Sequence, residues 1–210
     1  QFQRDYGLRV NGIVDEVTFR AIDKAYQNRV VKIFLDPGHG GTDPGAIGFG
    51  LSEKTIVLDI ALETARYLTD NYKGVEVKLS RTTDKTVSLK ERTDLANAWG
   101  ADYYVSFHSN AGGGTGFETY IFNKNVSQET INRQNDIHNY IARNLNVYDR
   151  GKKSANFHVL RETEMPAILI EYLFIDNKDD NRLLSSRSYR QTLGRLTAEA
   201  IASSFNLKKK

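Results

Sequence analysis

Two histidines and two glutamates occupy positions in this chain where side chains could do chemistry. His39 lies in a glycine-rich segment directly after the apolar run 31–35, and His108 directly follows a second apolar run. Glu53 opens the next helical stretch, and Glu171 lies inside a third apolar run. Two imidazoles and one carboxylate can form an open tetrahedral zinc site, and the remaining carboxylate can act as its base. The set predicts metal-assisted hydrolysis.

Three of these residues also have ordinary structural explanations. The glycine-rich turn around His39 could be a phosphate-binding loop, although it lacks the nucleotide-binding spacing and the Walker lysine. Glu53 stands in the first turn of a helix, where the helix dipole favours an acid with or without a function. His108 closes a buried strand, which is where open sheets bind ligands, but a hydrogen-bonded core histidine would fit there too.

Glu171 is the hardest of the four to explain structurally. A carboxylate within a strand of Ile, Leu and Tyr must be paired, bound to a metal or held with a raised pKa. The structural alternative is an ion pair with Arg92 or Arg81. Of the other two histidines, His138 is expected on the solvated side of an amphipathic helix, and His158 could line a cleft, although no spacing makes it a ligand.

The elements that must position these residues alternate along the chain. Apolar runs and period-two patterns predict strands at 31–36, 75–79, 102–107, 117–122 and 167–174. Helical spacing predicts helices at about 52–68, 88–99, 127–145 and 189–205, and Ser88 begins a capping box. This alternation predicts an α/β fold, with a mostly parallel twisted sheet and helices on both faces.

Residues 1–29 differ from the rest of the chain. An Asn-Gly turn at 11–12 precedes Asp15, which can cap a short helix, and so small a piece cannot hold a core alone. The phrases at residues 2–8, 10–14 and 18–19 resemble the C-terminal half of a small helical peptidoglycan-binding module. We therefore expect two parts: residues 1–29 as a remnant of that module or a linker, and residues 30–210 as a catalytic domain.

Composition excludes several classes of protein. The chain has no cysteine, which rules out thiolate metal sites, disulfides and a cysteine nucleophile, and which fits an extracytoplasmic location. The net charge of +3 is mild and its cations are scattered, so we expect no nucleic-acid partner. We also expect no membrane insertion, because no apolar run is long enough to span a bilayer. We expect the protein to be a monomer. Residues 1–5 lack the apolar region of a signal peptide, and the absence of an initiator Met suggests an excised fragment.

The motifs taken together resemble a known enzyme family. They are residues 34–41 (Phe-Leu-Asp-Pro-Gly-His-Gly-Gly), 53–54, 80–84 (Ser-Arg-Thr-Thr-Asp), 89, 92, 96–97, 100–102, 106–111 (Ser-Phe-His-Ser-Asn-Ala), 159–161, 165–171 (Met-Pro-Ala-Ile-Leu-Ile-Glu) and 177. Over about residues 31–205 the chain is similar to the zinc-dependent N-acetylmuramoyl-L-alanine amidases of the type-3 family. The resemblance implies one zinc ion bound by His39, Glu53 and His108, Glu171 as the catalytic glutamate, and cell-wall peptidoglycan as the substrate.

The resemblance has one departure and leaves some roles open. The family phrase usually continues Glu-x-Gly-Phe, but here Leu173 replaces the glycine. The stretch 123–156 has room for one helix, so we expect a form without the autoinhibitory helix of some relatives. From their positions, Asn110 and Arg161 could orient the substrate. The alternatives are another zinc peptidase acting on peptidoglycan, and a non-catalytic cell-wall binding protein.

Overall fold

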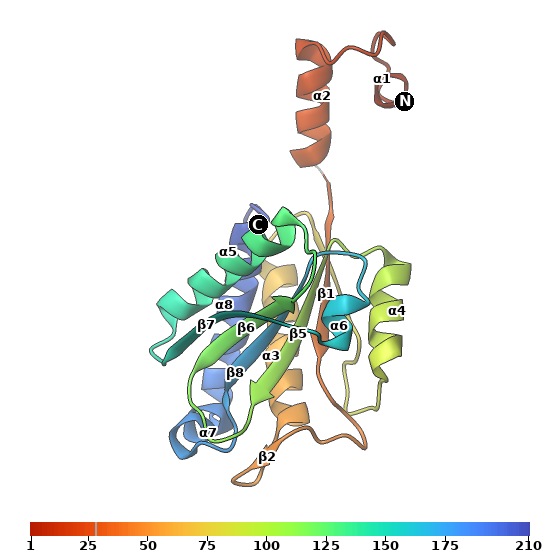
Figure 1. Cartoon of the computed structure of the whole chain (residues 1–210). Helices are drawn as coiled ribbons and strands as arrows, with labels where there is room; N and C mark the ends of the chain where they lie inside the picture. The colour runs from red at the N-terminus through yellow and green to blue at the C-terminus, as the bar shows by residue number, and fades with distance from the viewer. Residues whose placement is uncertain (28) are drawn as a thin grey trace. The chain divides into compact units, whose positions relative to one another are not determined.

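The computed structural model describes residues 1–27 and 29–210, which form two units, Gln1–Val30 and Val31–Lys210. The larger unit is built on a six-stranded sheet with the order β4-β1-β5-β8-β6-β7 (Figure 1). Its strands are β1 Val31–Pro37, β4 Val75–Leu79, β5 Tyr103–Asn110, β6 Phe117–Phe122, β7 Asp149–Ala155 and β8 Ala167–Phe174. The first four strands in this order are parallel, and β6 reverses direction against β8. A small hairpin, β2 Ile47–Gly48 and β3 Leu51–Ser52, precedes the first long helix.

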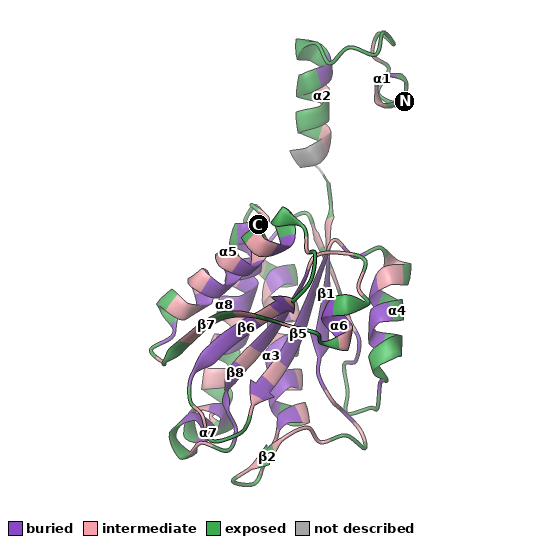
Figure 2. Ribbon diagram, in the orientation of Figure 1, coloured by how far each residue is buried: buried purple, intermediate pink, exposed green. Residues whose placement is uncertain are grey.

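Helices cover both faces of this sheet, as the sequence predicted. The larger apolar cluster packs α3 Glu53–Asn71, α5 Gln128–Asn144, α7 Lys178–Ser185 and α8 Arg187–Ser204 against one face. A smaller cluster packs α4 Leu89–Trp99 and the short α6 His158–Arg161 against the other. The central strands are almost entirely buried between them (Figure 2). This confirms the expected α/β class with a mostly parallel sheet.

Local sequence signals explain where these elements begin and end. The Ser88 side chain accepts a hydrogen bond from the backbone N–H of Glu91 and so caps α4, and Gly100 ends that helix in a left-handed conformation with φ 64°. The strands at 75–79, 117–122 and 167–174 have the predicted bounds. The sequence did not predict β7, α6 and α7, nor the short elements α1, β2 and β3. Residues 123–156 do contain a single helix, α5, followed by β7.

The prediction that His138 is solvated was wrong. Its imidazole is 2% exposed and lies between the Thr119 hydroxyl, 2.9 Å from Nδ1, and the Asp149 carboxylate, 3.0 Å from Nε2. The buried face of α5 includes the polar residues Thr130, Gln134 and His138. Strands β6 and β7 supply hydrogen-bond partners for Gln134 and His138, and Ser127 supplies one for Thr130. A polar sequence therefore does not mark the solvent face of this helix.

The smaller unit contains α1 Phe2–Asp5 and α2 Glu16–Gln27. Asp15 caps α2 by accepting a hydrogen bond from Thr18 N–H, as predicted. Among its described residues, only Gln3 and Thr18 are buried, and both are polar. The Gln3 side chain donates to Asn11, Ile13 and Thr18, so this unit is organised by hydrogen bonds more than by an apolar core. In the described part of the chain, none of the helices has the length and apolar character needed to cross a membrane.

Candidate active site

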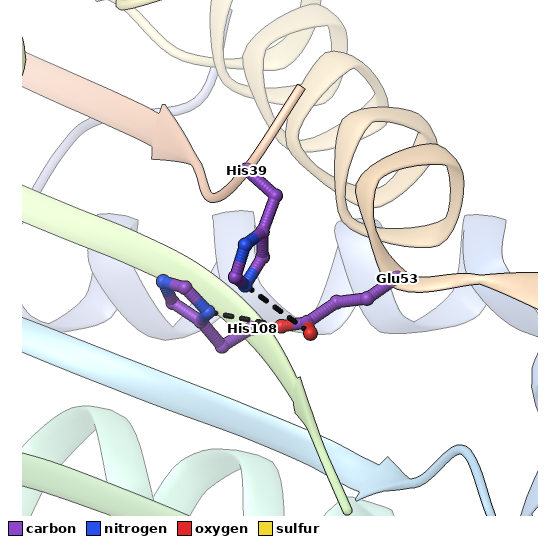
Figure 3. Close-up of side chains that lie close together, drawn as sticks. All are labelled: His39, Glu53 and His108. Carbon is purple, nitrogen blue, oxygen red and sulfur yellow. Dashed lines mark hydrogen bonds and ion pairs between the residues drawn. The ribbon is translucent and has the colours of Figure 1, made fainter. Parts of the chain in front are cut away.

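Adjacent parallel strands bring the predicted residues to one edge of the sheet. Strands β1, β5 and β8 are neighbours, and their carboxyl ends meet at the same edge. His39 follows β1 within the next turn, His108 lies near the end of β5, and Glu171 is the register partner of His108 on β8. Glu53, the first residue of α3, reaches the same point from the helix (Figure 3).

The side chains of His39, Glu53 and His108 converge. Glu53 Oε2 lies 3.2 Å from His39 Nε2, and Glu53 Oε1 lies 2.9 Å from His108 Nδ1 (Figure 3). One ligand atom from each residue lies within 4.8 Å of the others, which makes the group able to hold a metal ion. Burial alone would raise the pKa of Glu53, but the hydrogen bonds and charges of His108 and His39 hold that pKa well below its ordinary value.

Backbone groups fix the Glu53 carboxylate in place. Oε2 accepts a hydrogen bond from Ala46 N–H at 2.9 Å, and Oε1 accepts one from Ser109 N–H at 3.0 Å. The carboxylate is therefore ionised and oriented before any ligand binds. Such supporting contacts are what a metal-binding carboxylate needs in order to keep its geometry.

His39 is held in a conformation that few residues adopt. Its φ of 58° lies in the left-handed region, and Arg92 Nη2 donates to its carbonyl at 2.6 Å. Asp43 Oδ2 lies 2.8 Å from His39 Nδ1, which directs Nε2 toward Glu53. Sequence reasoning missed Asp43. The available signal was an acid four residues after the histidine in a tight glycine-rich turn, where a carboxylate can orient the imidazole.

Two glycines make the close approach of the imidazoles possible. A Cβ atom on Gly38 would lie 2.3 Å from Cε1 of His108. A Cβ atom on Gly45 would lie 2.6 Å from Glu53 Oε2 and 2.7 Å from Cδ2 of His39. The glycine-rich turn seen in the sequence therefore provides the space in which the two histidines meet.

Among the described residues, neither Arg92 nor Arg81 pairs with Glu171, as the structural alternative required. Its Oε2 atom is buried without a hydrogen-bond partner, whereas Arg92 pairs with Asp36 at 2.7 Å. Arg81 donates instead to the carbonyls of Pro37, Gly38, Thr83 and Lys54. Burial, reinforced by the charges of Glu53 and Glu118, raises the pKa of Glu171 well above its ordinary value.

Leu173, the departure from the family phrase, also has a left-handed backbone, with φ 62°, and its side chain is fully buried. Glycine adopts this conformation without strain, whereas another residue pays about 1–2 kcal/mol. The pairing of β5 with β8 shifts register between His108 and Asn110, beside this residue. The leucine therefore keeps the backbone path that a glycine would favour, and its side chain packs in the core.

A cleft of about 680 Å³ opens over these groups. Its lining includes His39, Glu53, His108, Glu171 and Asn110, and also His158. Arg161 is not among the lining residues; its guanidinium contacts Asn156 and Glu162. The structure thus brings the four principal predicted residues and Asn110 together, and places Arg161 beside the site rather than in it.

The sheet is open and mostly parallel, and imidazoles and carboxylates converge in a cleft at its carboxyl edge. These features define an enzyme of the α/β class. Comparison with known proteins identifies which one. The sequence pattern of the N-acetylmuramoyl-L-alanine amidase family matches residues 33–203, and this chain belongs to that family.

Individual relatives agree with this assignment. The chain is 53% identical over 180 residues to the sporulation-specific N-acetylmuramoyl-L-alanine amidase of Bacillus subtilis, covering 86% of this chain and 70% of the relative. It is 51% identical over 180 residues to the amidase CwlM of Bacillus licheniformis, covering 86% and 71%. A crystal structure of an N-acetylmuramoyl-L-alanine amidase from Clostridium difficile aligns with a TM-score of 0.81 at 35% identity, covering 85% of this chain and 98% of that chain. The chain is accordingly an N-acetylmuramoyl-L-alanine amidase, a peptidoglycan hydrolase.

Proposed function

We propose that this amidase cleaves the amide between the lactyl group of N-acetylmuramic acid and L-alanine with one zinc ion bound by His39, Glu53 and His108, and with Glu171 as the general base. The observation that carries the proposal is the convergence of two ring nitrogens and a carboxylate beside Glu171, whose Oε2 atom is buried without a hydrogen-bond partner. Zinc–ligand bonds of about 2.0–2.1 Å in a tetrahedron place ligand atoms about 3.3 Å apart. The separation of 3.2 Å between His39 Nε2 and Glu53 Oε2 fits that value.

The chemistry divides between the ion and the protein. When bound, zinc supplies Lewis acidity, which lowers the pKa of a coordinated water and polarises a substrate carbonyl. Glu171 accepts the proton of the attacking water on its carboxylate and later delivers it to the nitrogen of the leaving L-alanine. Its burial raises the pKa of the carboxyl group, whereas a dication bound nearby would oppose that shift.

The remaining roles follow from position and charge. Asn110 lines the cleft and is proposed to orient the substrate, and Arg161 is a second proposed contact at its border. The partner is peptidoglycan, and we propose a monomer that acts outside the cytoplasm without binding nucleic acid or inserting into a membrane. Residues 1–29 are proposed to be a remnant of a wall-binding module or a linker, and residues 30–210 the catalytic domain.

The test of the reaction is an analysis of new end groups after digestion of purified peptidoglycan. Free amino groups on L-alanine are expected; amino groups elsewhere in the stem peptide would indicate a peptidase, and no release would indicate a binding protein.

The test of the metal site is His39→Ala, which should remove stoichiometric zinc and hydrolysis together. Full zinc occupancy in that variant would overturn the ligand assignment. A chelator should stop the reaction of the native chain, and added zinc should restore it.

A further inference from the structure

A buried carboxylate next to the proposed base anchors an unusual group of cations. Glu118 on β6 is 1% exposed and is the register partner of Glu171 on β8. Its Oε2 atom accepts from Arg150 Nε at 2.6 Å and from Lys153 Nζ at 2.5 Å. Both cations come from β7, the strand on the outer side of β6.

The charges in this group do not cancel. Two cationic side chains share a single carboxylate oxygen, so the group of Glu118, Arg150 and Lys153 carries one positive charge in excess. The Arg150 and Lys153 side chains are 30% and 34% exposed, so both also reach solvent. A carboxylate that only needed neutralisation would require one of these cations. The second one remains available to an anionic ligand.

Asn110 connects this group to the cleft. Its amide Nδ2 donates to Glu118 Oε1 at 2.8 Å, and the same residue lines the cleft beside His108 and Glu171. A substrate fragment leaving the cleft on the β6 side therefore passes from Asn110 toward the two cations.

The opposite wall of the cleft offers no comparable charge. Val87 and Leu89 line it there, and Arg92, the one arginine among the described lining residues, is buried in its ion pair with Asp36. An uncharged saccharide suits that wall, whereas the partly exposed cations Arg150 and Lys153 lie outside the described lining and connect to its residue Asn110 through Glu118.

We propose that Lys153 and Arg150, with Asn110, form a subsite that binds a carboxylate of the stem peptide. The inference rests on the proposed function, since it assumes that Glu171 marks the bond that is cut. Neighbouring strands are about 4.8 Å apart, and the Lys153 ammonium reaches back to Glu118, one strand from Glu171. A peptide residue spans about 3.5 Å, so the second residue of the stem peptide is the one that carries the bound carboxylate.

The experiment compares two soluble N-acetylmuramoyl peptides that differ only in whether the carboxyl of the second residue is free or amidated. The native chain should prefer the free carboxylate by about tenfold in kcat/KM, mainly through KM, the scale of a charge-assisted hydrogen bond. Lys153→Met should reduce this ratio toward one, and Lys153→Arg should restore most of it. Lys152→Met is the matched control, because Lys152 on the same strand contacts Asn139 instead of Glu118.

The outcomes separate this proposal from the proposed reaction. Cleavage of the amidated peptide by the native chain reports the amidase activity itself. A lost preference in Lys153→Met, with the preference kept in Lys152→Met, supports the subsite. An equal loss of turnover on both peptides in Lys153→Met would mean that the cations only support Glu118 and would overturn it. So would a native chain that cleaves both peptides equally well.

Discussion

Glu171 is the residue for which a catalytic role and a structural role can be distinguished most clearly. Its Oε2 atom is buried and makes no hydrogen bond to the described residues, so no contact of that atom holds the fold together. Glu171→Gln should therefore retain zinc and fold normally but lose turnover by about a hundredfold or more, the usual scale of general acid–base catalysis. Metal analysis, substrate binding and kinetics on one preparation would check this. Loss of zinc would make Glu171 a ligand, and retained turnover would make it structural.

Gly38 is a second residue whose role can be isolated. A Cβ there would occupy the space of the His108 ring, 2.3 Å from Cε1, so Gly38→Ala should displace a proposed ligand. We expect zinc affinity to fall by about 10–100-fold, as for a disturbed supporting shell. Zinc competition with a chromogenic chelator measures this effect. Gly50→Ala is the control for general destabilisation, because its φ of 83° strains an alanine while its Cβ would meet no atom within 4 Å and displace no ligand. Unchanged affinity in Gly38→Ala would show that the His108 ring can move without cost to the site.

At the scale of elements, α5 is tied to β6 and β7 through His138. Burial lowers the pKa of His138 and outweighs the charge of Asp149, which raises it. The folded protein thus prefers a neutral imidazole, and the unfolded chain binds more protons below its ordinary pKa of about 6.5. The free energy of unfolding should therefore decrease as the pH falls through that value.

Urea unfolding of the metal-free chain at pH 7.5 and 5.5 would test this expectation, with His138→Gln as the comparison. The variant should show a smaller decrease in stability between the two pH values. The other titrating groups, His39 among them, are the same in both proteins and cancel in the difference. Equal decreases would mean that His138 is not the group responsible.

The elements also show how far the sequence could lead. Strand β8 was predictable because it is continuously apolar apart from Glu171, and α4 because Ser88 and Gly100 mark its ends. Strand β7 was not, since Asp-Arg-Gly-Lys-Lys-Ser-Ala has no apolar alternation and an edge strand needs none. The four principal site residues were predictable from their places beside apolar runs. Asp43 was missed because its one signal, an acid four residues after a histidine, is weak in an exposed loop, and the three-dimensional turn is what shows that it touches His39.

At the scale of the whole molecule, the two units are expected to be functionally separable. The residues that line the cleft all belong to the unit Val31–Lys210. Deleting residues 1–29 should leave kcat/KM on a soluble muropeptide nearly unchanged, because none of the residues described as lining the cleft lies in that segment. Kinetics on the shortened chain, with circular dichroism to verify folding, would check this. A large loss by a folded protein would show that the segment helps to build the site.

The strand order β1-β5-β8 has a further consequence for the stage of folding at which the site is assembled. His39 and Glu53 are near neighbours along the polypeptide, but His108 and Glu171 arrive with two later strands of a parallel sheet. Parallel strand pairs join segments that are distant in the sequence. They form slowly, because the chain loses loop-closure entropy before the new contacts offset that loss. A partly folded intermediate without β5 in place presents two donors, too few for a stable chelate. The proposed donor set is therefore complete only once β5 has paired with β1, and we expect metal capture to follow the formation of that part of the sheet.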